Sequence, residues 1–186
     1  GGNNNVYCQD NEIAWMDWGM LETASDLHDF TRRLIAVRRE HPVFRRRRFL
    51  AGGALDGGGH GHEIAWLTPE AAQMTQDDWK ASFGRALTVF LDGETIAEPD
   101  ARGQRVVDDS FLLMFNAHYE DIDFTVPGAD FGDEWEVVVD TTQARGVRED
   151  AAPVLSDGTV TVGQRSTVVL RRTQPPASGG NVEANL

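Results

Sequence analysis

The sequence predicts a mixed fold, in which a polar loop and one helix are followed by an all-β sandwich. Two patterns carry this prediction. Between residues 25 and 41, apolar residues recur at spacings of three and four, the period of one helical face. After Pro42, apolar runs become short and are separated by Gly, Asp or Pro, which is typical of sandwich strands.

The helix is predicted over residues 25–41. Thr23 and Asp26 have the spacing of a capping box, and Pro42 ends the helix because the residue before a proline disfavours the α region. A single helix cannot bury its apolar stripe alone, so it packs either on the β domain or on a larger body. The abrupt start of the chain favours the larger body. The stripe comprises Leu27, Phe30, Leu34 and Val37.

The sandwich strands are predicted from short apolar runs bounded by turn residues. Between the first helix and these runs, residues 52–61 are rich in glycine and predict a flexible loop. Residues from 173 onward have little to bury and predict a disordered tail. The predicted strands are Glu63–Leu67, Ala86–Leu91, Phe111–Asn116, Ile122–Val126, Trp135–Asp140, Thr159–Val162 and Ser166–Leu170.

Composition limits the classes of partner. The chain has 186 residues, 40% of them hydrophobic, and a formal net charge of −13. Such an acidic surface repels phosphate backbones and anionic lipids, so we expect neither nucleic acid nor membrane as a partner. A neutral glucan meets no such repulsion. Cys8 is the single cysteine, which precludes an internal disulfide and is consistent with a cytoplasmic location.

The opening segment concentrates amide, carboxylate and aromatic side chains. Amides and carboxylates bond sugar hydroxyls, and aromatic rings stack on the apolar faces of pyranoses, so this loop is a candidate sugar-binding site. A loop whose polar side chains stiffen its own backbone is the alternative, and the two roles can coexist. Trp15 and Trp18 are expected to be core or interface aromatics. The candidate residues are Asn3, Asn4, Asn5, Tyr7, Gln9, Asp10 and Asn11.

This segment resembles part of the bacterial glycogen debranching enzymes of the isoamylase type, in the α-amylase clan of glycoside hydrolases. The resemblance is carried by Asn3, Asn4, Asn5, Tyr7, Cys8, Gln9, Asp10 and Asn11. It continues in the family's order to about residue 172, through Leu34–Phe49, Ala65–Pro69, Asp108–Ala117, Trp135–Thr141 and Arg165–Leu170.

The resemblance implies a domain organisation. Residues 1–42 would be the end of a (β/α)8 barrel, namely the loop after its eighth strand and its eighth helix. Residues 43–172 would be the C-terminal β-sandwich, and residues 173–186 the tail. Barrel active sites lie in the loops after the strands, so the opening loop would face a substrate cleft.

The implied function is hydrolysis of α-1,6 branch linkages in glycogen or limit dextrins, without a cofactor or metal. The family's catalytic carboxylates come from earlier barrel strands, so the resemblance assigns no catalytic residue here, and the chain by itself is expected to be inactive. Asp10 and Glu12 are a remote alternative as a catalytic pair. Two other functions stay open: a non-catalytic glucan-binding or scaffolding module, and a related isoamylase or trehalose-forming enzyme.

Other chemistry-bearing residues have simpler explanations. Cys8 has no histidine in its loop and is expected to be an unreactive buried side chain. His60 and His62 are too few for a metal site. The run Arg45–Arg48 is expected to pair with carboxylates at a domain junction rather than bind phosphate. We expect a core-filling role for Trp66, Trp79 and Trp135. The alternative is that these tryptophans form a starch-binding platform on the surface.

Overall fold

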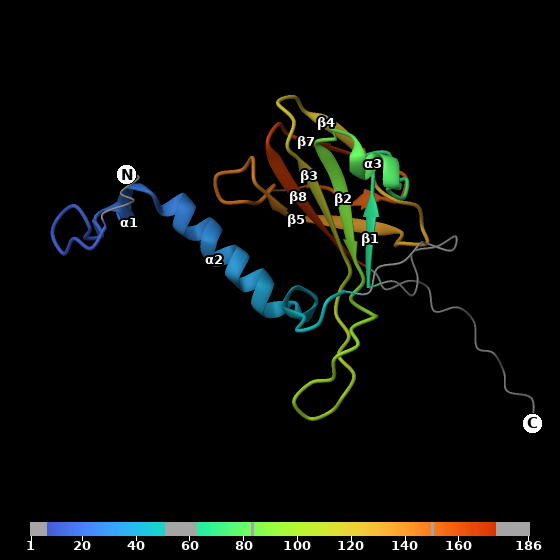
Figure 1. The fold of residues 1–186 in the computed structure, drawn as a ribbon, viewed down its shortest axis with the longest axis horizontal. Helices are drawn as coiled ribbons and strands as arrows, with labels where there is room; N and C mark the ends of the chain where they lie inside the picture. Colours follow the sequence, from blue (N-terminus) through green and yellow to red (C-terminus); the bar gives the residue numbers. More distant parts are fainter. Residues whose placement is uncertain (1–6, 51–62, 83, 150, 174–186) are drawn as a thin grey trace, which may run out of the picture.

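The computed structural model describes residues 7–50, 63–82, 84–149 and 151–173. It consists of two stacked antiparallel sheets with a helical segment projecting to one side (Figure 1). Some of the predictions lie outside the described residues: the glycine-rich loop with His60 and His62, the tail from residue 174, and Asn3, Asn4 and Asn5.

The larger sheet has six strands in the order β1-β2-β3-β8-β5-β6, all paired antiparallel. Antiparallel pairing suits this sheet because its two faces can be buried to different degrees. The strands of this sheet are β1 (Ile64–Leu67), β2 (Ala86–Leu91), β3 (Phe111–Asn116), β5 (Glu134–Asp140), β6 (Val154–Leu155) and β8 (Ser166–Arg172).

A two-stranded sheet covers the inner face of the larger one. It pairs β4 (Ile122–Thr125) with β7 (Thr159–Val162). Between the two sheets lies the main core, in which Trp135 and Phe124 are fully buried. Asn116 fixes the stacking, because its side-chain amide donates to the carbonyls of Val162 and Gly163 at 3.0 and 3.1 Å. The predicted sandwich is therefore present.

The outer face of the large sheet is covered only in part. A second apolar cluster, which includes Phe111, Val139 and Val169, lies under the segment that follows the helix. That segment contributes Val43, which is buried, and Phe44, whose ring centroid lies 4.6 Å from that of Phe111. Toward the ends of β1 and β3, the same face is more open to solvent, with Trp66 on β1 and Phe115 on β3 each 38% exposed.

The strand predictions are confirmed at all seven positions, with ends that differ by at most two residues. Two elements within the β domain were not predicted. The short strand β6 has only two residues, too few for a periodic pattern. The helix α3 (Gln76–Lys80) begins with a capping box, in which Thr75 and Asp78 bond reciprocally to each other's backbone amides.

The predicted helix is α2 (Ser25–Glu40), which follows the single turn of α1 (Met20–Thr23). The expected end before Pro42 is confirmed, since His41 is extended and η1 (Pro42–Arg45) forms a 3-10 turn. The expected capping box at Thr23 is wrong. Thr23 is the last residue of α1, its hydroxyl faces the Met20 carbonyl at 3.5 Å, and Ala24 precedes α2 without a side-chain cap.

Contacts in its middle hold α2 against strand β5. A bulge interrupts the β5–β8 pairing at Val138, and the Val138 carbonyl accepts bonds from the Arg33 guanidinium at 3.3 and 3.2 Å. One turn earlier, the Phe30 ring lies where a Cβ on Gly146 would be, at 2.3 Å. Gly146 also has a φ of +72°, so both its backbone and this contact require glycine.

Candidate functional site

The described part of the opening loop is stiffened by its own side chains. The Trp15 indole donates to the Asp10 carboxylate at 2.8 Å, and the Asn11 amide donates to Gln9 at 3.2 Å. The other end of the Asn11 side chain accepts the Ile13 amide at 3.0 Å. These bonds show the loop-stiffening role that the sequence allowed for Asp10, Gln9 and Asn11, and they leave a sugar-binding role open.

The same loop presents its side chains to solvent. Tyr7 is 84% exposed, and its backbone φ of 20° is unusual for a residue with a side chain. Trp15 and Trp18 are 60% and 72% exposed, so they are not core residues of this chain. Cys8 is exposed too, which corrects the expectation that it is buried. It lies in the same turn as Tyr7, where the neighbouring described residues are exposed too.

The apolar stripe of α2 is mostly unburied. Leu27 is 68% exposed and Leu34 is 39% exposed, whereas Phe30 and Val37 are half-buried. No residue of α2 is fully buried. Leu21 of α1 and the two tryptophans of the loop are exposed as well. The β domain therefore covers only part of the helix, and a long apolar surface remains without a partner within the described residues.

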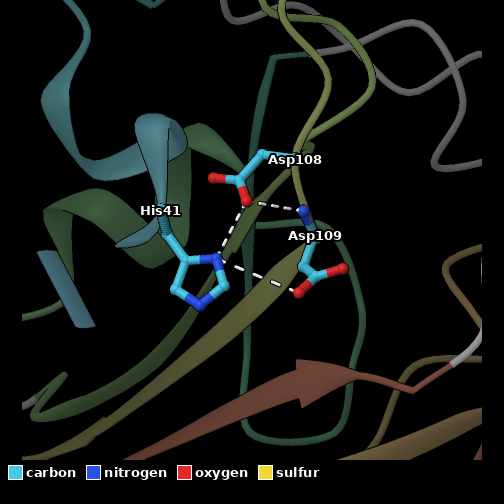
Figure 2. A group of neighbouring side chains, drawn as sticks. All are labelled: His41, Asp108 and Asp109. Carbon is cyan, nitrogen blue, oxygen red and sulfur yellow. Dashed lines mark hydrogen bonds and ion pairs between the residues drawn. The ribbon is translucent and has the colours of Figure 1, made fainter. Parts of the chain in front are cut away.

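A buried histidine–carboxylate cluster joins the end of α2 to the β domain (Figure 2). His41 Nδ1 lies 2.8 Å from an Asp108 oxygen, and the other Asp108 oxygen accepts the Val43 amide at 2.8 Å. The first oxygen also accepts the Asp109 amide at 2.9 Å. Asp108 thus closes both the helix end and the loop before β3. No local sequence pattern predicts this pair, because its members lie 67 residues apart.

Among the described residues, His41, Asp108 and Asp109 are also the one group with the spacing of metal ligands. Their ligand atoms lie within 4.8 Å of one another. Both oxygens of Asp108 are already bonded, and the Arg171 cation lies 3.7 Å from Asp109. Hydrogen bonds account for the His41 and Asp108 side chains, and ion pairs with His41 and Arg171 account for that of Asp109, so the cluster is a structural clamp.

Asp140 is a fully buried carboxylate at the end of β5. Burial alone would raise its pKa, but the hydrogen bond from Arg148 and those from the Thr142 amide and hydroxyl lower the pKa below its ordinary value. These bonds hold the loop that follows β5 against the sheet. Because that loop carries Gly146, Asp140 also supports the surface on which Phe30 packs.

Three arginines of the run Arg45–Arg48 make contacts that hold the chain in place. Arg46 is buried, pairs with Glu63 at 3.1 Å and donates to the Asp92 carbonyl. The backbone amides of Arg47 and Arg48 donate to one Glu98 oxygen at 3.1 and 2.8 Å. The bond from Arg48 is the main reason that the pKa of Glu98 is lowered. The expected pairing with carboxylates is confirmed for Arg46.

The expected core role of the three tryptophans is confirmed for one of them. Trp135 is fully buried, and its indole donates to the Gly132 carbonyl at 3.2 Å. Trp66 and Trp79 lie on the surface, with 38% and 50% exposure, and the expectation that they fill the core is wrong. Side chains alternate along β1, and Trp66 is on the face turned away from the main core. Trp79 lies on α3, a helix that the sequence analysis did not predict.

In the described part of the chain, every helix is too short or too polar to span a bilayer.

The chain is similar to known proteins over most of its length. The isoamylase C-terminal family model matches residues 63–171. A glycogen operon protein GlgX homolog of Mycobacterium tuberculosis is 47% identical over 172 residues, which is 92% of this chain and 24% of that protein. An isoamylase of a Flavobacterium species is 26% identical over 140 residues, 75% of this chain and 17% of that protein.

A solved structure has the same fold. The type I pullulanase of Bacillus subtilis, crystallised with maltose, matches with a TM-score of 0.51 and 19% identity, over 87% of this chain and 18% of that one. The chain spans about a quarter of the length of the relatives most similar in sequence. It belongs to the isoamylase C-terminal family and corresponds to the C-terminal region of glycogen debranching enzymes of the isoamylase type.

Proposed function

We propose that this chain is the C-terminal portion of a glycoside hydrolase that cleaves α-1,6 branch linkages of glycogen or its limit dextrins. In this proposal, residues 1–42 end a catalytic (β/α)8 barrel and residues 43–172 form the sandwich that follows it. The opening loop lies beside the substrate cleft, and the catalytic carboxylates come from the preceding part of the barrel. The substrate is a branched α-glucan, and no cofactor is required.

The unpartnered apolar face of α2 is the observation that supports this proposal most. An apolar stripe on an isolated surface helix is unfavourable, because burying each such side chain stabilises a protein by about 1.5–3 kcal/mol. Leu27 and Leu34 leave this stabilisation unused in the described residues. A barrel packed against α2 would bury both, and the relatives have about three quarters of their length beyond the matched region.

The opening loop fits the same arrangement. A loop after a barrel strand lies at the active face, where substrate hydroxyls meet protein side chains. Tyr7 is open to solvent, whereas Asp10 and Gln9 are oriented by bonds within the loop. Side chains that are exposed yet fixed by their neighbours can bind a sugar with little loss of conformational freedom.

The test compares two polypeptides on phosphorylase limit dextrin of glycogen, with release of reducing ends as the readout. One is this chain, and the other adds the coding sequence upstream of it. We expect release by the longer polypeptide and none by the 186-residue chain. Loss of α-1,6 linkages, followed by proton magnetic resonance of the anomeric region, identifies the bond that is cleaved.

Two results would contradict the proposal. Reducing ends released by this chain alone, and abolished by Asp10→Asn, would make Asp10 catalytic. An upstream sequence without a barrel, in a polypeptide that binds glucan but cleaves nothing, would instead support a non-catalytic module.

A further inference from the structure

Trp66 and Trp79 form an exposed aromatic corner at the β1 edge of the large sheet. In β1, Ala65 and Leu67 point into the core, so Trp66 points to the outer face. Its ring centroid lies 5.3 Å from that of Trp79, with an angle of 73° between the rings. Both rings keep a large part of their surface open, at 38% and 50% exposure.

The backbone holds this corner in place. After β1 the chain turns back, with the Met74 amide bonded to the Trp66 carbonyl at 2.9 Å. The next residue, Thr75, starts α3 with the capping box to Asp78, and this sets Trp79 one turn into the helix. The two rings are therefore positioned by hydrogen-bonded elements, and a ligand would not have to order them first.

The corner is separate from the apolar face of α2. In Figure 1, α3 lies at the β1 edge of the sheet, whereas α2 extends away on the other side. The strand order agrees, because α2 packs on β5, four strands away from β1. Phe115 lies on the same outer face, since Trp66 pairs through Val89 with Leu113, two residues from Phe115.

We propose that the Trp66–Trp79 corner is a non-catalytic binding site for an α-glucan chain. The choice of glucan rests on the function proposed above. Indole faces stack on the C–H faces of pyranoses, and two rings at a steep angle fit a curved chain better than a flat one. The net charge of −13 disfavours a polyanion at this surface. Exposed Gln76 and Asp77 on α3 offer groups that bond sugar hydroxyls.

Affinity electrophoresis of this chain in gels that contain glycogen tests the proposal. The variants are Trp66→Ala, Trp79→Ala and the double variant. The matched control is Phe49→Ala, which removes a fully exposed aromatic ring far from the corner in sequence. We expect each tryptophan variant to weaken retardation about two- to tenfold, because one stacked ring contributes that much. The control should migrate like the wild type.

A second measurement covers the case in which a variant fails to fold. Maltoheptaose should protect the wild-type indoles from acrylamide quenching, while isomaltoheptaose protects less. Trp66→Phe keeps an aromatic face and should keep most of the retardation. Wild-type retardation by the folded double variant, or no retardation and no protection of the wild type, would overturn the proposal.

The longer polypeptide separates this proposal from the function on which it rests. We expect the double variant to keep its kcat/KM on a short branched oligosaccharide but to show a raised KM for glycogen. A longer polypeptide that cleaves no branch would contradict the proposed function while gel retardation of this chain still supports the corner. Rings shielded from acrylamide in the longer polypeptide without glucan would show a domain interface there, and would overturn the binding site.

Discussion

At the scale of single residues, three buried polar side chains organise this domain. Asn116 joins the two sheets, Asp108 joins the helix end to the loop before β3, and Asp140 holds the loop after β5. Each bonds to several partners, so each buried group is satisfied and its removal would leave partners without a bond. Losing a charged hydrogen-bond partner, such as Asp108 or Asp140, destabilises a protein by about 1.5–3 kcal/mol.

Asp140→Asn should lower the free energy of unfolding by about 2 kcal/mol at pH 7, because it removes a charged acceptor for Arg148 and Thr142. The folded pKa of Asp140 lies below its unfolded value of about 3.9, so its stabilisation is complete above that pH. As pH falls through the folded pKa, the stabilisation is lost. The difference between wild type and variant should therefore shrink below about pH 4.

Urea unfolding followed by circular dichroism from pH 3 to pH 7 measures this difference. Asp130→Asn is the control, because Asp130 is exposed on the turn before β5 and should change little. A constant difference across the whole pH range would show that the Asp140 charge is not what stabilises the loop.

At the scale of elements, α2 has two unlike halves. Its middle and its second half are fixed to the β domain through Phe30, Arg33 and the His41 clamp. Its first half is joined through the exposed pair of Asp26 with Arg145 at 3.1 Å, which contributes little in water. Leu27 faces solvent there. The helix is thus secured at one end and is free to open at the other.

Amide exchange should show this gradient in the 186-residue chain. We expect amides of residues 25–30 to exchange faster than those of residues 34–40, and the latter to approach the protection of strands β3 and β8. The reason is that local opening of the first turns breaks few apolar contacts. Uniform protection along α2 would show that another surface of this chain covers the first half.

The sequence was informative about elements and less so about their partners. The 3.6-residue period of α2 and the alternation or short apolar runs of the strands are local patterns, so they predicted those elements nearly to the residue. The His41–Asp108 clamp and the Val138 bulge depend on pairing between distant segments, which a single sequence does not show. The capping box expected at Thr23 does not form, because Thr23 is the last residue of α1. A capping box is found instead at Thr75, where it begins α3.

Trp66, Trp79 and Trp135 show that a single sequence also does not reveal which side chains reach the surface. Composition favoured a core role, but the direction of Trp66 depends on which face of β1 meets the core. The loop residues were predicted from their chemistry, and the structure adds the bonds of Asp10 and Asn11. In the proposed enzyme, what these residues bind would depend on the barrel as well as on this loop.

At the scale of the whole molecule, the β domain and the helical segment differ in how much of their apolar surface the described residues bury. The two sheets bury a core between them, whereas the helix and the opening loop expose most of their large apolar side chains. In the proposed enzyme, the sandwich anchors the last helix and so sets the position of the opening loop at the cleft. The chain would then influence catalysis by placing Tyr7 and Asp10, without supplying a reacting group.

The most direct test is kcat/KM of the longer polypeptide on a branched dextrin, measured with melting curves for Tyr7→Ala and Asp10→Ala. Glu22→Gln is the control, because Glu22 is exposed on α1 and is not one of the candidate sugar-binding residues. We predict a fall of about 10- to 100-fold for the first two variants at an unchanged melting temperature, as expected for a lost sugar contact of about 1–3 kcal/mol. Wild-type kinetics with a lowered melting temperature would contradict the account and leave the loop a purely structural role.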